Sequence, residues 1–258
     1  QLARDVPSTQ DAFALRGALP VLVSLLHPNS EEPLESIDLK RECAAALRSL
    51  ATEHPANQAA IVSEGGISRL IELLQTQPPA QGSFTKSRTP DKLRRASQQR
   101  SNSPKISLKR SAASSNLYAG LATPDIQCSI AQLQCNIAGA LCSLAAARAS
   151  QHLIVEAGGI LPLAGLLAND NQGAQEFAAG ALRMIATSPD ARATMSEAGI
   201  IKLLAMLIDH GSAKAKEQAA GCLAMLAIDS TANQEAIARE LVIIMSTDVV
   251  GELECATQ

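Results

Sequence analysis

Residues 158–167 read Gly-Gly-Ile-Leu-Pro-Leu-Ala-Gly-Leu-Leu, and residues 179–182 read Ala-Gly-Ala-Leu. Versions of the first phrase also occupy residues 17–26, 65–74 and 199–208. Versions of the second phrase occupy residues 44–47, 138–141 and 220–223. Where no extra residues intervene, successive copies lie 41 residues apart. Self-similarity at a fixed period of this length is the signature of a repeat protein.

Each repeat is predicted to contain three helices. A short first helix, such as residues 150–156, ends at the glycine, whose backbone freedom lets the chain turn sharply. The second helix carries apolar residues at helical spacing, as at Leu19, Leu22, Val23 and Leu26. The third helix, for example residues 175–187, has one apolar face, formed by Phe177, Ala178, Ala181, Leu182 and Ile185. No unit can bury both its faces alone, so stacked units must share one continuous core.

The composition is consistent with an all-α chain of thin, closely stacked helices. Hydrophobic residues make up 47% of the sequence but aromatic residues only 2%, so the core must consist of Leu, Ile, Val and Ala. None of the six cysteines forms a CxxC pair, which favours a reducing, intracellular setting, cytoplasmic with a nuclear location left open. No apolar run approaches the roughly 18 residues of a membrane span, so no transmembrane segment is expected.

One basic segment interrupts the repeats. Residues 80–115 contain nine Lys or Arg, one acid and nine serines, which gives them a charge of +8; the rest of the chain, with 13 bases and 24 acids, carries −11. Such a composition cannot bury enough apolar surface to fold, so we predict a disordered insertion over residues 76–125. Ser97 follows Arg94 and Arg95, and Ser103 precedes Pro104, so both are candidate phosphorylation sites. A solvated charged loop without a role is the alternative.

The predicted organisation therefore has three parts. Residues 1–75 hold the first repeat and the first two helices of the second, and residues 76–125 form the insertion. Residues 126–258 hold the third helix of the second repeat, repeats three and four, and an incomplete terminal repeat with a run at residues 241–245 but no recognisable third helix. Because solenoids end in polar caps, we expect the protein to extend beyond at least one end.

The two phrases and the 41-residue period resemble those of armadillo-repeat proteins, over about 70% of the chain. HEAT repeats are the runner-up, but they have two helices and lack the glycine between a short first and a second helix. The resemblance implies a right-handed superhelical solenoid whose third helices line a concave groove, where extended peptides or partner proteins bind. Such a likeness carries the fold further than the function.

The expected groove differs from that of nuclear-import receptors, which resemble this chain in fold. Their third helices carry Trp and Asn ladders; the matching positions here hold small residues or Met, so the composition is more similar to plant-type or vacuole-associated armadillo scaffolds. Recurrent glycines there indicate either close helix–helix approach or a smooth groove floor. The candidate groove-lining residues are Arg48, Ser49, Asn136, Gly139, Ser143, Gly180, Arg183 and Gly221.

Catalytic and metal-binding patterns are missing from the sequence. It contains no HExxH, Walker or GxGxxG motif, and the four histidines lack Cys, Ser or Asp partners at useful spacing. Cys128, Cys135 and Cys142 lie seven residues apart, about 10.5 Å along a helix, too far for one zinc ion, and are expected to be small core residues. Neither a cofactor nor a metal is expected.

The sequence predicts a non-enzymatic scaffold that binds partner proteins or peptides along its groove, regulated by phosphorylation of the insertion. The alternative is the substrate-recognition region of a larger ubiquitin-ligase-type protein. We expect no nucleic-acid binding by the repeats. Nucleic-acid binding through the insertion would be weak and salt-sensitive, because no aromatic residues are interleaved among its Lys and Arg residues.

Overall fold

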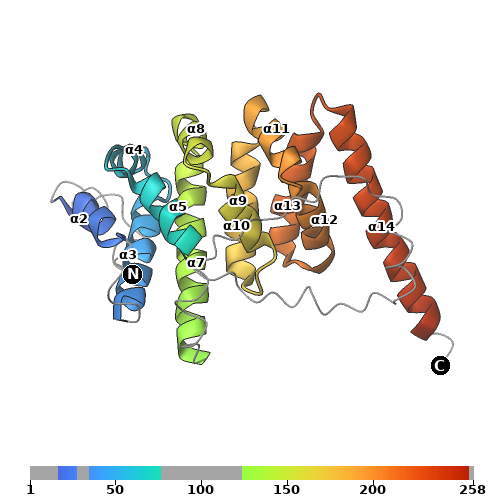
Figure 1. The fold of residues 1–258 in the computed structure, drawn as a ribbon, viewed down its shortest axis with the longest axis horizontal. Helices are drawn as coiled ribbons and strands as arrows, with labels where there is room; N and C mark the ends of the chain where they lie inside the picture. The colour runs from blue at the N-terminus through green and yellow to red at the C-terminus, as the bar shows by residue number, and fades with distance from the viewer. Residues whose placement is uncertain (1–16, 28–34, 77–123, 256–258) are drawn as a thin grey trace.

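The computed structural model describes residues 17–27, 35–76 and 124–255, and these residues form helices and the turns between them (Figure 1). In chain order the helices are α2 (Ala18–Leu25), α3 (Glu35–Ala51), α4 (Pro55–Ser63), α5 (Gly66–Thr76), α7 (Pro124–Ala145), α8 (Arg148–Glu156), α9 (Ile160–Leu167), α10 (Gln172–Ile185), α11 (Pro189–Glu197), α12 (Ile200–His210), α13 (Ala213–Ala227) and α14 (Thr231–Cys255). The all-α solenoid predicted from the sequence is therefore confirmed.

The three-helix unit recurs as the phrases predict. The first helices α4, α8 and α11 each have nine residues. The second helix of every repeat follows a left-handed glycine, at Gly17, Gly65, Gly158 and Gly199, with φ between 70° and 74°. A side chain at these positions would be strained, since only glycine adopts this conformation freely. The turn at Gly158 sets α8 and α9 at 91° to each other.

The third helices stack side by side in the order α3, α7, α10 and α13, and the second helices cover the other side of the same core (Figure 1). The leucine of the second phrase anchors this layer, because Leu47, Leu141 and Leu182 are all fully buried. α7 packs against α3 although residues 77–123 precede it in the chain. The insertion therefore leaves the stacking of repeats one and two in register. The insertion itself lies outside the described residues.

Amide side chains tie three of the third helices, α3, α7 and α13, to the helix that follows each of them. Asn57 Nδ2 donates to the carbonyl of Leu50 at 3.0 Å, and Gln151 Nε2 donates to the carbonyl of Ala145 at 2.9 Å. Asn233 Nδ2 donates to Leu226 O at 2.7 Å. The last carbonyls of a helix have no partner within it, so these buried amides satisfy them where water cannot.

α7 is, among the described helices, the single one that is long and apolar enough to cross a membrane. Its position explains the apolar composition, because 67% of the apolar stretch is buried between α3 and α10. Its first turns project beyond this packing, as Figure 1 shows, and there Cys128 is exposed. The prediction that Cys128 is a core residue is thus wrong, whereas Cys135 is buried and Cys142 half-buried.

The last helix departs from the repeat. The sequence predicted an incomplete terminal repeat with an apolar run at residues 241–245, but α14 is one unbroken helix that includes this run. Glu240 stands where the 41-residue period would place a glycine, so nothing interrupts the helix. α14 diverges from α13 (Figure 1), and Ala220 is consequently exposed, whereas its counterpart Ala179 is fully buried.

Candidate functional site

A pocket of about 400 Å³ opens on the third-helix layer between α3 and α7. It is lined by Arg41, Glu42, Ala45, Arg48, Ser49, Gln132 and Asn136. Three of the predicted groove residues, Arg48, Ser49 and Asn136, are among them. The small side chain of Ala45 is part of the pocket wall.

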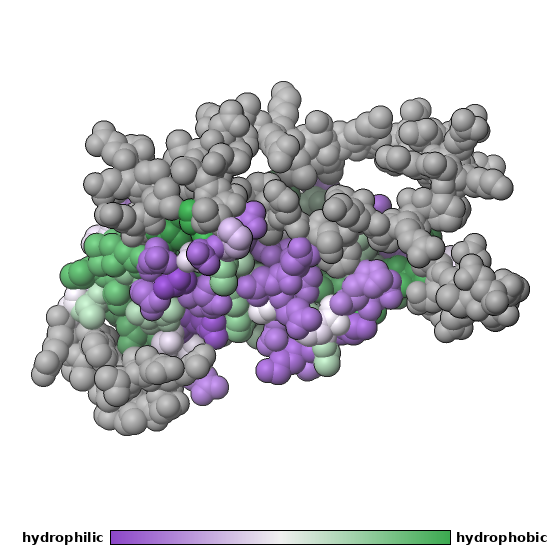
Figure 2. All heavy atoms as spheres, turned by 90° about the horizontal axis from the view of Figure 1, so that it is seen from below, coloured by the Kyte–Doolittle hydropathy of each residue, from purple (hydrophilic) through white to green (hydrophobic). Residues whose placement is uncertain are grey.

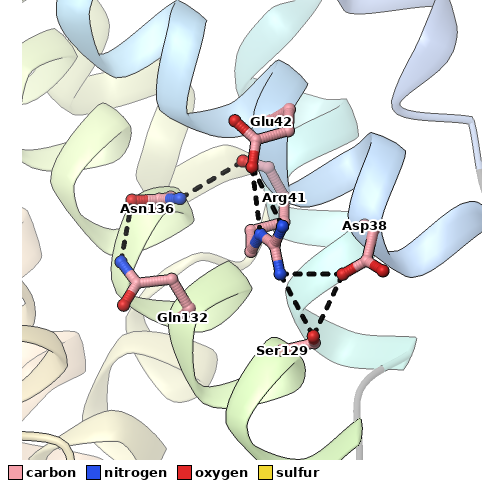
Figure 3. A network of polar contacts seen from close by, with 6 residues as sticks. All are labelled: Asp38, Arg41, Glu42, Ser129, Gln132 and Asn136. Atoms are coloured by element: carbon pink, nitrogen blue, oxygen red, sulfur yellow. Dashed lines mark hydrogen bonds and ion pairs between the residues drawn. The ribbon is translucent and has the colours of Figure 1, made fainter. Parts of the chain in front are cut away.

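One wall of the pocket is a polar network (Figure 3). Arg41 Nη1 donates to Asp38 Oδ1 at 2.7 Å, and Arg41 Nη2 donates to Glu42 Oε1 at 3.0 Å. Ser129 of α7 contacts both Arg41 and Asp38, at 3.1 and 3.0 Å. Asn136 Nδ2 donates to the carbonyl oxygen of Arg41 at 3.2 Å. The network joins the first two repeats, and its two carboxylates neutralise the charge of Arg41.

Arg48 extends from α3 across α7. Its Nη1 donates to Asn136 Oδ1 at 3.3 Å, and its guanidinium lies 4.4 Å from the centre of the Phe177 ring on α10. Between these two contacts the side chain passes over Gly139, where a Cβ would lie 2.5 Å from Arg48 Cδ. Glycine at this position therefore makes the crossing possible. The cation over a ring face is an attractive arrangement.

The same arrangement recurs two helices along. A Cβ at Gly221 of α13 would lie 2.6 Å from Cδ of Arg183, so Arg183 lies across α13 as Arg48 lies across α7. Between them, a Cβ at Gly180 would lie 3.1 Å from Cys142 Sγ. In every case the covering side chain directly follows the repeat leucine of the preceding third helix.

This packing decides between the two interpretations of the glycines. Gly139 and Gly180 are buried, and Gly221 is half-buried under Arg183. The expectation that Gly139 and Gly180 form an exposed groove floor is therefore wrong. These glycines provide room for the side chain of the neighbouring helix, which is the close-approach alternative.

Arg183 has neither an ion-pair nor a hydrogen-bond partner among the described residues, and its Nε atom is buried without an acceptor. It does act on the cysteines around it. Burial raises the pKa of the Cys142 thiol to about 11, Arg183 opposes this shift, Glu176 adds to it, and Arg48 opposes it weakly. Burial likewise raises the pKa of Cys222 to about 12, again against Arg183. Both thiols are consequently neutral at physiological pH.

Arg48, Cys142 and Arg183 therefore form a row across three successive third helices, which we call the arginine row. Ser143 lies beside it, where Ser143 Oγ donates to the carbonyl of Gly139 at 3.1 Å. Both arginines were predicted from the sequence, whereas Arg41, Gln132 and the contact of Phe177 were not. Phe177 was assigned wholly to the core face, whereas it is half-buried at the edge of the core. Ser97 and Ser103 lie outside the described residues.

Catalytic and metal-binding groups do not converge in the described part of the chain. Within it, no set of three or more His, Cys, Asp or Glu side chains could hold a metal ion. His152 lies on the surface beside Glu156, with 3.6 Å between Nδ1 and Oε1.

Figure 2, which views the solenoid from one edge, shows mainly hydrophilic surface across the middle and hydrophobic surface towards the α2 end.

No protein-family profile matches the chain. A search of curated protein sequences likewise finds no match. Solved structures do match. The designed armadillo repeat protein YIII(Dq)4CqI superposes with a TM-score of 0.62 at 19% identity, over 96% of this chain and 81% of the other. The fold is that of armadillo repeats.

Two further solved structures match the chain, and one of them is again a designed armadillo repeat protein. A designed armadillo repeat protein in complex with the peptide (KR)4 has a TM-score of 0.62 at 18% identity, over 96% of this chain and 80% of that one. An engineered protein from a structural genomics consortium has a TM-score of 0.64 at 22% identity, over 95% of this chain and 78% of that one. The right-handed armadillo solenoid implied by the family resemblance is confirmed.

Proposed function

We propose that this armadillo chain is a non-enzymatic scaffold that binds extended segments of partner proteins along its third-helix layer. The observation that carries the proposal is the pocket between α3 and α7, whose lining comes from two successive third helices. An extended chain crossing the solenoid would meet this pocket and then the arginine row. In one armadillo structure of the same fold, the partner is a peptide.

The chemistry of the pocket suits a peptide backbone. Gln132 and Asn136 offer amide groups, and Arg48 offers guanidinium donors, so both the N–H and the C=O groups of an extended segment can be satisfied. Main-chain hydrogen bonds give such complexes affinity, and pockets for side chains give them specificity. At about 400 Å³ the pocket is large enough for one large side chain of the partner.

A displayed library of random peptides, selected on the full chain, tests the proposal. Ala45→Arg would fill the pocket from its own wall, so selected peptides should lose at least tenfold in affinity. Leu161→Glu is the matched control, because Leu161 is 52% exposed on α9, a second helix. Peptides that bind Ala45→Arg and the unmodified chain equally well would place the binding surface elsewhere and refute the proposal.

Regulation by the insertion is a further part of this proposal. Residues 80–115 carry +8, and the described segments on either side end at Thr76 and resume at Pro124, the first residue of α7. The insertion is thus tethered to a helix that lines the pocket. Phosphorylation of Ser97 and Ser103 would add about −1.5 to −2 charge each and weaken its attraction to the acidic body. Equal partner affinity at low salt with and without residues 80–115 would contradict this.

An intracellular location also belongs to the proposal. Five cysteines, at positions 43, 128, 135, 142 and 222, are free thiols in the described residues. Such thiols persist in the reducing conditions of the cytosol and nucleus. Fractionation of cells that express the tagged chain would test this location.

A further inference from the structure

We propose that the partner segment is acidic and that its carboxylates pair with Arg48 and Arg183. This inference rests on the proposed function, because it names the chemistry of the segment that the third-helix layer binds. Both residues come from the same repeat position, directly after the leucine of the second phrase. Equivalent arginines of two repeats would therefore each bind one carboxylate of the segment.

The arginines of the described residues differ in their ion-pair partners. Arg41 is paired with two carboxylates, and Arg69 donates to Glu72 Oε2 at 3.2 Å. Arg183 contacts no carboxylate within the described residues, and its Nε lacks an acceptor. A buried N–H group without an acceptor is destabilising, and a carboxylate paired with this guanidinium would lower that cost. Arg183 is therefore the stronger of the two anchor points.

Arg48 is held ready in a different way. The guanidinium carbon of Arg48 lies over the Phe177 ring and Asn136 accepts from Nη1, and these two contacts hold the group in place. A guanidinium has five N–H donors in one plane, so the hydrogen bond to Asn136 leaves donors available. A carboxylate approaching in that plane can form a charge-assisted pair without first ordering the side chain.

The spacing suits an extended chain. Arg48 and Arg183 belong to α3 and α10, with α7 between them, and packed helices lie about 8–10 Å apart. Since each arginine reaches across the next helix in the same direction, the two guanidinium groups should be about two helix spacings, or about 16–20 Å, apart. At roughly 3.3 Å per residue, an extended segment covers that distance in about five to six residues. Acids separated by that interval could occupy both anchors.

Other charges near the row do not satisfy it. Glu176 lies on the same helix as Arg183 but pairs with Lys214 at 3.8 Å. Cys142, between the two arginines, is a neutral thiol because burial raises its pKa to about 11. A basic peptide such as the (KR)4 bound by the designed armadillo protein would meet like charge here.

Fluorescence anisotropy with the full chain tests the proposal. The probes are three labelled octapeptides, (Glu-Ser)4, (Gln-Ser)4 and (Lys-Ser)4, measured at low salt. We expect (Glu-Ser)4 to bind at least tenfold more tightly than the other two. Arg183→Gln and Arg48→Gln should each weaken (Glu-Ser)4 about fivefold to twentyfold and leave (Gln-Ser)4 unchanged. Arg183→Lys, which keeps the charge but not the planar fork, should give an intermediate loss.

The insertion supplies the matched control, because its own arginines could also attract an acidic peptide. Arg94→Gln combined with Arg95→Gln should change the affinity for (Glu-Ser)4 less than twofold. The proposal is overturned if (Glu-Ser)4 binds no better than (Gln-Ser)4, or if only this control pair weakens it. If library peptides still depend on the pocket at Ala45 in that case, the binding function stands and only the acidic preference fails.

Discussion

Alanine substituted at Gly139 and at Gly159 should have different consequences for stability, although both glycines are buried. A Cβ at Gly139 would meet the side chain of Arg48, with Cδ at 2.5 Å. A Cβ at Gly159 would meet Cγ2 of Ile154 at 2.7 Å, Cδ1 of Ile71 at 2.8 Å and the carbonyl oxygen of Ile154 at 2.9 Å. The first obstacle is a flexible chain that can swing away, whereas the second includes backbone.

The magnitudes follow from these contacts. Alanine inside α7 should gain about 1 kcal/mol in helix propensity over glycine. Displacing Arg48 from Phe177 should cost about 0.5–1 kcal/mol, so Gly139→Ala should leave the free energy of unfolding almost unchanged. Gly159 precedes α9 and gains no such propensity. Overpacking against two isoleucines and a carbonyl should therefore cost Gly159→Ala about 1–3 kcal/mol.

Urea unfolding followed by far-UV circular dichroism measures the free energy of unfolding of both variants under the same conditions. Affinity for (Glu-Ser)4 gives a second readout, because Gly139→Ala displaces Arg48 and should weaken the peptide about as much as Arg48→Gln does. The reasoning is refuted if the two variants lose equal stability. It is also refuted if Gly139→Ala keeps full peptide affinity, since Arg48 would then not need the space above Gly139.

Other perturbations test the core, the turns and the thiols. Leu182→Ala should cost about 2–5 kcal/mol of unfolding free energy in urea, because Leu182 is fully buried, whereas Leu161→Ala on the exposed side of α9 should cost less than about 0.5 kcal/mol. Gly199→Ala should cost about 1–2 kcal/mol in the same assay through its φ of 70° alone, as no atom lies within 4 Å of the added Cβ. Maleimide labelling of the native chain at neutral pH, read by mass spectrometry, should modify exposed Cys128 rapidly. Cys142, which is half-buried, should react far more slowly until the chain is unfolded, because burial raises the pKa of its thiol to about 11 and leaves little thiolate at neutral pH. Comparable rates at the two cysteines would show that Cys142 is accessible.

The fold was predictable because the same turn and core residues recur at a fixed spacing along the chain. Four glycines marked the turns, and the leucine of each second phrase marked the core, since φ > 0 and burial are properties of single positions. The end of the regular repeat was less visible. Only the structure shows that α14 continues as one helix, although the lack of a glycine at position 240 was a usable signal.

The site was predictable only in part. Arg48, Ser49 and Asn136 were selected from their place after the repeat leucine or on its helix, and the pocket includes all three. The glycines were selected too, but which side chain covers each one depends on the neighbouring helix. Identical heptad spacing likewise gave Cys128 and Cys135 opposite exposures, because only one of them lies within the overlap of α7 with its neighbours.

By itself the sequence determined what recurs every 41 residues: three helices, a left-handed glycine and a leucine core. These depend on backbone dihedral angles and on apolar spacing, and both are local quantities. The tertiary structure alone decided that Arg48 reaches Phe177, which is 129 residues later in the chain, and that Arg183 meets no carboxylate in the described residues. Side-chain pairing across the stack depends on the distance and angle between helices, and these are set by the packing of the whole core.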